Sequence, residues 1–138
     1  MSRRLLDTNI LCVCWRRTAP WDLSTVSEED ARRWARNLIE FEETNAVASP
    51  VVLEILGGVR TKRELVLTET FLSEFRVIDN GKVLREDWDE AKRSARRVPP
   101  DGKPRDLGDC LIQSIAKRLR YDVRTFDRRF RDHRRRDP

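Results

Sequence analysis

Short apolar stretches that can form strands alternate with longer segments of helical periodicity, and this alternation constrains the fold more than any other feature. The strand candidates are residues 3–6, 46–48, 75–79 and 122–126. The segments between them place apolar side chains three or four residues apart, as an amphipathic helix requires. This pattern predicts an α/β fold in which helices cover both faces of a central parallel sheet, giving three α/β/α layers.

Local signals mark the ends of several predicted helices. Asn9 is expected to cap a helix over residues 10–17, and residues 27–30 and 61–64 match the capping-box pattern. Asn80-Gly81 predicts a turn after the third strand. We expect residues 1–138 to form a single domain, with an arginine-rich tail from about residue 128.

Charge and composition narrow the class of protein. The 138 residues include 29 Lys and Arg against 24 Asp and Glu, a net charge of +5, which favours a polyanionic partner. No apolar stretch approaches the roughly 18 residues that span a bilayer, and Asp7 interrupts the apolar start of the chain. The three cysteines are an odd number, which argues against a disulfide framework. We therefore expect a cytoplasmic protein that does not associate with membranes.

A single histidine, His133, limits the chemistry available to an enzyme of this sequence. A Ser-His-Asp or Cys-His nucleophile needs a well-held imidazole as its base, and His133 lies within the arginine-rich tail. A ribonuclease that works with two histidines would need one more than the chain has. If the protein is an enzyme, its sequence favours carboxylate chemistry, with or without a metal ion.

Carboxylates stand where the predicted strands end. Asp7 follows the first strand candidate and Asp127 the last, while Glu54 lies one turn into the helix after the second. The carboxyl ends of parallel strands meet at one edge of a sheet, so these side chains are expected to converge. Asp109 begins the helix before the last strand, and we expect it at the other edge unless that helix is tilted. Converging carboxylates repel one another, and a hard cation such as Mg²⁺ or Mn²⁺ would remove the repulsion.

Four segments that contain these carboxylates, residues 5–11, 53–58, 109–116 and 123–130, resemble the acidic motifs of PIN-domain ribonucleases and follow the family order. The chain is similar in size to the VapC toxins of toxin–antitoxin pairs. The resemblance implies a parallel sheet of strand order 3-2-1-4-5 and a site for one or two Mg²⁺ or Mn²⁺ ions. The ligands that it implies are Asp7, Glu54, Asp109 and Asp127. It also implies that Thr125 hydrogen-bonds Asp7 or a water on the metal, and that Asn9 supports Asp7.

The same resemblance implies a function. It indicates a metal-dependent endoribonuclease that hydrolyses phosphodiesters in tRNA or other structured RNA, forms homodimers and is blocked by a cognate antitoxin. A catalytically silent module on the same fold, which binds RNA or a partner protein, is the alternative. Asp106 lies three residues before Asp109 and could exchange roles with it. The chain departs from the family pattern at Arg120-Tyr121, where relatives often have glycine, and at Arg124 in a strand expected to be buried.

Overall fold

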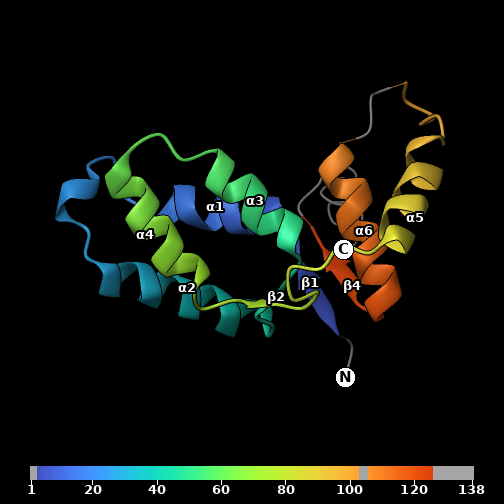
Figure 1. The fold of residues 1–138 in the computed structure, drawn as a ribbon. Helices are drawn as coiled ribbons and strands as arrows, with labels where there is room; N and C mark the ends of the chain where they lie inside the picture. The colour runs from blue at the N-terminus through green and yellow to red at the C-terminus, as the bar shows by residue number, and fades with distance from the viewer. Residues whose placement is uncertain (1–2, 103–105, 126–138) are drawn as a thin grey trace, which may run out of the picture.

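The computed structural model describes residues 3–102 and 106–125, and within them helices alternate with short strands as predicted (Figure 1). The strands are β1 (Arg4–Leu6), β2 (Ala46–Val47), β3 (Arg76–Val77) and β4 (Asp122–Arg124). The helices are α1 (Thr8–Thr18), α2 (Glu28–Glu42), α3 (Ser49–Gly57), α4 (Lys62–Leu72), α5 (Arg85–Ala95) and α6 (Leu107–Leu119), with a 3₁₀ turn over Leu23–Thr25. No helix in these two ranges is long and apolar enough to cross a bilayer.

The strands pair in parallel, which confirms the predicted α/β class. β1 pairs with β4, with Leu5 opposite Val123, and β2 pairs with β3. β1 and β2 are neighbours, and the Thr44 hydroxyl donates to the Arg4 carbonyl oxygen at 2.7 Å. The described residues thus form two parallel ladders, and the strand order 3-2-1-4-5 stays a prediction. Phe126, the expected end of the last strand, lies outside the described residues.

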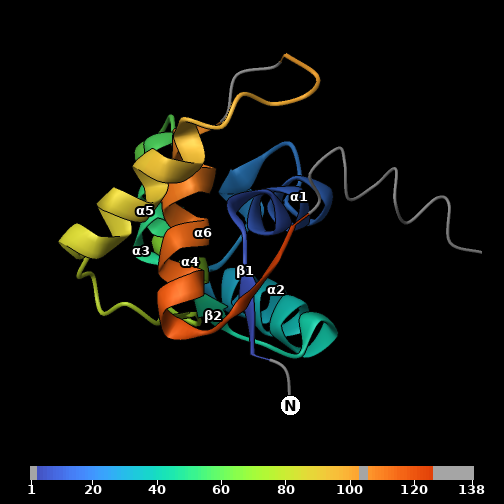
Figure 2. The ribbon, with the colours of Figure 1, turned by 90° about the vertical axis from the view of Figure 1, so that its right-hand side faces the viewer.

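Helices cover the strands from two sides. Figure 2 shows β1 and β4 side by side, with α5 and α6 on one side of them and α1 and α2 on the other. Trp15 of α1 packs edge-on against Trp34 of α2 and Phe71 of α4, with ring centroids 5.7 and 5.4 Å apart. The most deeply buried apolar side chains come from strands and helices alike: Leu5, Leu6, Ile10, Leu11, Val47, Val51, Leu67, Phe71, Ile112 and Ile115.

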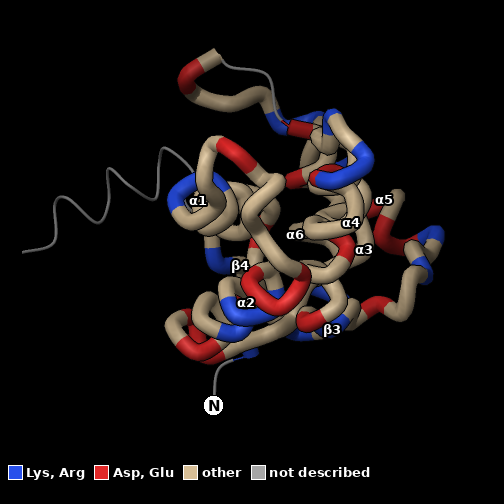
Figure 3. Tube along the Cα trace, turned by 90° about the vertical axis from the view of Figure 1, so that its left-hand side faces the viewer, with Lys and Arg blue, Asp and Glu red and all other residues tan. Residues whose placement is uncertain are grey.

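The predicted start of α2 is confirmed in detail. The Ser27 hydroxyl accepts a hydrogen bond from the Asp30 backbone N–H at 3.1 Å, and the Asp30 carboxylate accepts one from Ser27 N–H at 2.9 Å. Both halves of a capping box are therefore present. Acidic residues fill the first turn of this helix and arginines follow them (Figure 3), and Arg33 pairs with Asp30 at 2.8 Å. Such exposed pairs add little stability individually, so the cap and the buried face hold α2 in place.

The third strand candidate is shorter than predicted because the turn begins early. Only Arg76–Val77 forms ladder structure, as β3, where residues 75–79 were expected. Asn80 and Gly81 both have positive φ, 54° and 73°, which confirms the predicted turn. The residues between β3 and this turn bring the Asp79 carboxylate close to Ser49, the first residue of α3.

Arg124, the unexpected charge in β4, forms a buried ion pair with Glu42 at the end of α2. Arg124 Nε lies 3.1 Å from Glu42 Oε2, and the two side chains are 8% and 3% exposed. The Arg4 guanidinium of β1 donates to the Glu42 carbonyl oxygen. A buried charge is tolerated when it is paired and hydrogen-bonded, so Glu42 explains how an arginine fits into this strand.

A second buried carboxylate joins α5 to α6. Asp87 of α5 is 1% exposed and binds Arg118 of α6 through two hydrogen bonds, of 2.7 Å to Nε and 3.0 Å to Nη2. The Leu84 backbone N–H donates to the same carboxylate at 2.9 Å. Burial alone would raise the pKa of Asp87, but Arg118 and the Leu84 N–H together lower that pKa below its ordinary value.

The Asp87–Arg118 ion pair should make the stability of the fold depend on pH in the acid range. Because the folded-state pKa of Asp87 is lowered, its contribution is complete above about pH 5 and is lost as the pH falls below about 4. We expect Asp87→Asn to unfold at lower urea concentration than the wild type at neutral pH and to lose part of the acid dependence. Glu90, whose pKa is lowered to about 2 by Lys117 and Arg93, supplies acid dependence that remains in the variant. Identical pH profiles of the two proteins would contradict the prediction.

Candidate functional site

Asp7 lies where the carboxyl ends of β1 and β4 meet. Its backbone N–H donates to the Arg124 carbonyl oxygen at 2.9 Å, and its side chain is almost completely buried. Asp7, and not Asn9 as expected, caps α1, because its carboxylate accepts from the Thr8 N–H at 2.7 Å. A carboxylate at a helix N-terminus also interacts favourably with the helix dipole. Strand and helix together therefore hold the Asp7 carboxylate in one position.

Glu54 of α3 lies against the first turn of α6. A Cβ atom placed on Gly108 would lie 2.5 Å from Glu54 Oε1 and 3.2 Å from Asp106 Oδ1, so glycine leaves the room that the Glu54 carboxylate occupies. The expectation that this helix begins at the other edge of the sheet is wrong. α6 runs antiparallel to β4 (Figure 2), so its start returns to the carboxyl end of the strands.

The charges of this site act on one another. Partial burial raises the pKa of Glu54, and the nearby carboxylates of Asp106 and Asp7 raise it further. The Thr8 hydroxyl lies close enough to lower this pKa, although less than burial raises it. Three acidic side chains from three different segments therefore share one region at the carboxyl end of the strands.

Two aspartates compete for the third acidic position. Asp106 caps α6, and its carboxylate accepts from the N–H groups of Gly108 at 2.8 Å and Asp109 at 3.4 Å. Asp109 is exposed in the first turn of the helix. Asp106 is the one whose charge raises the pKa of Glu54. The interpretation that Asp106 and Asp109 can exchange roles therefore stays open.

Asn9 and Thr125 bind each other beside Asp7. The Asn9 amide donates to the Thr125 hydroxyl at 3.2 Å, and that hydroxyl lies 3.3 Å from Asn9 Oδ1, to which it can donate in turn. This contact links the first turn of α1 to the residue that follows β4. Asp127, the fourth predicted acidic residue, lies outside the described residues.

Asp79 is a supporting residue that sequence reasoning missed. It is 5% exposed, and its carboxylate accepts from the Ser49 backbone N–H at 3.1 Å and from the Ser49 hydroxyl at 2.5 Å. The residue at the cap position of α3, Ala48, has no side chain that could do this. Asp79 therefore caps the helix that carries Glu54. The sequence did contain one signal that could have identified Asp79, namely its position at the end of the third strand candidate.

Removing this cap has a measurable expected cost. We expect Asp79→Ala to lower the free energy of unfolding by about 1–3 kcal/mol, because it leaves two donors at the start of α3 without their acceptor. Ser49→Ala removes only one of the two hydrogen bonds and should cost less. Urea denaturation would measure both, with Asp89→Ala on α5 as a control. A loss for Asp79→Ala no larger than that of the control would contradict the assignment.

The oxygen donors of the site suit a hard cation, although the described residues do not form a closed cage. Within residues 3–102 and 106–125, no three Asp, Glu, Cys or His side chains lie together in a way that could hold a metal ion. Mg²⁺, however, is commonly held by one or two carboxylates and completes its shell with waters. The Thr8 hydroxyl oxygen is buried without a hydrogen-bond partner of good geometry in the described part of the chain. The carboxylates of Asp7 and Glu54 and this hydroxyl are oxygen donors of the kind that Mg²⁺ takes.

Comparison with known proteins identifies the family. The PIN domain family matches residues 21–136, a range that includes Glu54, Asp109 and Asp127, while Asp7 precedes it. Neither a curated protein nor a solved structure shows significant similarity to the chain. The match covers most of the sequence, and the parallel strands with their interleaved helices agree with it. The chain belongs to the PIN domain family, whose members are generally nucleases.

Proposed function

We propose that the protein is a metal-dependent endoribonuclease that hydrolyses phosphodiesters in tRNA or other structured RNA. The observation that carries the proposal is the meeting of Asp7, Glu54 and the first turn of α6 at the carboxyl ends of β1 and β4. Ligands of parallel α/β sheets bind at this edge. The mutual repulsion of the carboxylates calls for a cation, and a phosphodiester needs one to approach them.

Each residue of the site has a proposed task. Asp7, Glu54, Asp109 and Asp127 would hold Mg²⁺ or Mn²⁺, with Asp106 as the alternative to Asp109. The ion would supply Lewis acidity toward the phosphodiester and toward an attacking water. The cap on α1 fixes the Asp7 carboxylate, and Gly108 leaves the Glu54 carboxylate the space that a side chain would fill. The Asn9–Thr125 contact keeps the end of β4 against α1.

Product chemistry tests the mechanism directly. Purified full-length protein would be incubated with total tRNA in Mg²⁺, in Mn²⁺, or in chelator. We expect cleavage only with a divalent ion, and products with 5′-phosphate and 3′-hydroxyl ends, because water and not the ribose 2′-hydroxyl attacks. Equal cleavage in chelator, or 2′,3′-cyclic phosphate ends, would reject the proposal.

The biological setting that we propose is a toxin–antitoxin pair. In this setting the protein forms a homodimer, and a cognate antitoxin blocks the acidic site. Growth arrest on expression, relieved by co-expression of a small neighbouring reading frame, would support the toxin role. Normal growth during expression of active enzyme would contradict that role without affecting the nuclease assignment.

One observation favours a second candidate function. The described residues hold no group of three metal-ligating side chains, as a catalytically silent module for binding RNA or a partner protein would also show. Mn²⁺ titration by calorimetry separates the two. Binding that disappears in Asp7→Asn and Glu54→Gln supports the nuclease, and an absence of binding in the wild type supports the silent module.

A further inference from the structure

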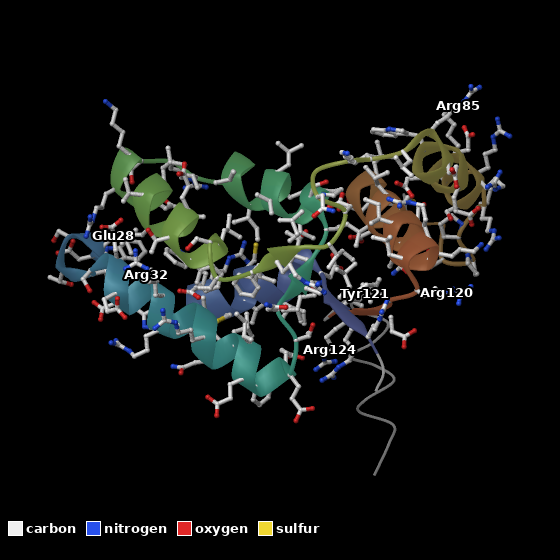
Figure 4. All side chains as sticks on the ribbon, turned by 60° about the horizontal axis from the view of Figure 1, so that its bottom comes forward. Glu28, Arg32, Arg85, Arg120, Tyr121 and Arg124 are labelled. Atoms are coloured by element: carbon white, nitrogen blue, oxygen red, sulfur yellow. The ribbon has the colours of Figure 1, made fainter. Side chains whose placement is uncertain are left out.

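A cluster of exposed arginines lies at the amino ends of the strands, which is the end of the sheet opposite to the acidic site. Arg3 precedes β1, Arg76 begins β3, and Arg120 and Tyr121 precede β4. Figure 1 shows the starts of these strands and the end of α6 at the same end of the molecule, and Figure 4 shows Arg120 and Tyr121 there. Asp7 follows Arg3 by four residues of extended chain, so about 13 Å separate the two along β1.

Tyr121 organises two of these arginines. The guanidinium carbon of Arg3 lies 5.6 Å from the centre of the Tyr121 ring, a cation–π contact. Arg76 Nη2 donates to the Tyr121 hydroxyl at 2.9 Å. The Tyr121 N–H donates to the Ala116 carbonyl oxygen at 2.8 Å, which ties the ring to the end of α6. Two positive groups from distant segments are therefore held close together before any ligand binds.

The cluster has an excess of positive charge. Arg3, Arg76 and Arg120 form no ion pair with any residue of the described ranges. The glutamates at this end of the sheet have other partners: Glu42 binds Arg124, Glu43 lies 3.9 Å from Arg4, and Glu74 binds Arg36 at 3.1 Å. Asp122 is the exposed acid beside the cluster, so three positive charges face one negative charge. A surface of this kind attracts anions.

Arg120 occupies a backbone conformation that favours glycine. Its φ of 61° and ψ of 49° lie in the left-handed region, directly after the last turn of α6. Glycine adopts this conformation without steric strain, whereas a side chain with a Cβ atom is strained there. Glu43 ends α2 in the same left-handed conformation, so this geometry is a way of ending a helix. The chain leaves α6 at this residue, which places the exposed Arg120 directly before Tyr121 and β4.

We propose that Arg3, Arg76 and Arg120, organised by Tyr121, bind phosphates of the RNA substrate at the end of the sheet opposite to the acidic site. The proposal rests on the proposed function for its choice of ligand. Arginine guanidinium groups match phosphate oxygens with two parallel hydrogen bonds, and aromatic rings such as that of Tyr121 are surfaces on which bases can stack. A polar hollow of about 450 Å³ between α5 and α6 reaches Tyr121, and its lining includes the basic Arg97 and Lys117 as well as the acidic Glu90 and Asp122. It offers hydrogen-bonding groups to the nucleotides next to the bound phosphates.

The test compares RNA binding and cleavage in variants of the full chain. Fluorescence anisotropy of a labelled hairpin RNA, in chelator to prevent cleavage, would measure affinity over a range of salt concentrations. We expect the triple variant Arg3→Ala/Arg76→Ala/Arg120→Ala to bind about tenfold or more weakly and its salt slope to shrink by about 2 to 3. Tyr121→Phe keeps the ring but loses the Arg76 hydrogen bond, so it should weaken binding less. Arg32→Ala serves as a control, because it removes one positive charge at the opposite end of the molecule from Arg120 and Tyr121 (Figure 4).

A glycine variant separates binding from folding. We expect Arg120→Gly to raise the melting temperature, because it relieves the left-handed strain, and at the same time to weaken RNA binding. If Arg120 does not contact RNA, the variant should raise the melting temperature and leave RNA binding unchanged, and that result would remove Arg120 from the proposed contact. In Mg²⁺, the triple variant should keep its kcat and show a raised KM for the hairpin.

The possible results distinguish this inference from the nuclease assignment. If the triple variant binds and cuts the hairpin as well as the wild type does, the arginine cluster is not an RNA contact and this inference is overturned alone. The inference would also be overturned if the triple variant lost binding to phosphatidylserine vesicles while its RNA affinity stayed equal to that of the wild type. If the wild type binds the hairpin through these arginines but never cuts it, the inference stands and the nuclease assignment fails.

Discussion

Glu54→Gln is expected to reduce RNA cleavage by a factor of about 100 or more while making the protein more stable in chelator. The loss follows because the variant removes a carboxylate from the proposed metal site, where even supporting residues commonly change activity 10- to 100-fold. The gain follows because burial, Asp106 and Asp7 raise the pKa of Glu54, so its charged form is unfavourable in the folded protein at neutral pH. Glutamine has the same size and leaves the contact with Gly108 unchanged.

Rate and stability should therefore move in opposite directions, which a damaged fold cannot produce. Single-turnover cleavage in Mn²⁺ would measure the rate, and thermal unfolding in chelator would measure the stability. Glu69→Gln makes the same chemical change at an exposed position of α4 and serves as the control. Full cleavage by Glu54→Gln would remove this residue from the site.

Glu42→Ala is expected to lower the free energy of unfolding by about 3–5 kcal/mol, because it removes the buried carboxylate that pairs with the Arg124 guanidinium. The double variant Glu42→Leu/Arg124→Met removes both charges and fills a similar volume, so it should recover most of this loss. Urea denaturation would measure the free energy of unfolding of the wild type, of Glu42→Ala and of the double variant. The adjacent Glu43→Ala, at an 84% exposed side chain, should change stability by no more than about 0.5 kcal/mol.

The double variant is the informative one. If the double variant is as unstable as Glu42→Ala, the ion pair stabilises the fold more than apolar side chains of similar volume do. The expectation that the double variant recovers most of the loss would then be wrong. If Glu42→Ala itself costs no more than Glu43→Ala, the environment of Arg124 is not as dry as its 8% exposure indicates.

Local patterns predicted the elements well because helices depend on neighbouring residues. The capping box at Ser27 and the turn at Asn80-Gly81 appear as expected. The cap of α1 was assigned to Asn9 instead of Asp7, since both residues can cap and the choice depends on where β1 ends. Strand lengths were overestimated because a strand exists only where a partner pairs with it, and apolar patterning does not show the partner.

The candidate site could be predicted in part. Asp7 and Glu54 were identified because both follow strand candidates, and the structure brings their charges together. The edge at which α6 begins was predicted wrongly. A helix that runs antiparallel to the strand it leads into begins at the carboxyl end of that strand, so Asp109 needs no tilt of α6 to lie there. Asp79 was missed because its contact with Ser49 joins residues that lie 30 positions apart. Contacts of this range follow from the folded topology and leave little trace in a single sequence.

The hydrogen bond between the Asp7 N–H and the Arg124 carbonyl oxygen has a consequence for synthesis in the cell. β1 depends for its ladder partner on β4, since Leu5 pairs with Val123, which is synthesised far later than Leu5. A nascent chain that contains Asp7 cannot form this hydrogen bond until β4 has been synthesised, so the carboxyl end of β1 stays incomplete until then. In the proposed nuclease, the acidic residues at the carboxyl ends of β1 and β4 therefore come together only after β4 has been synthesised.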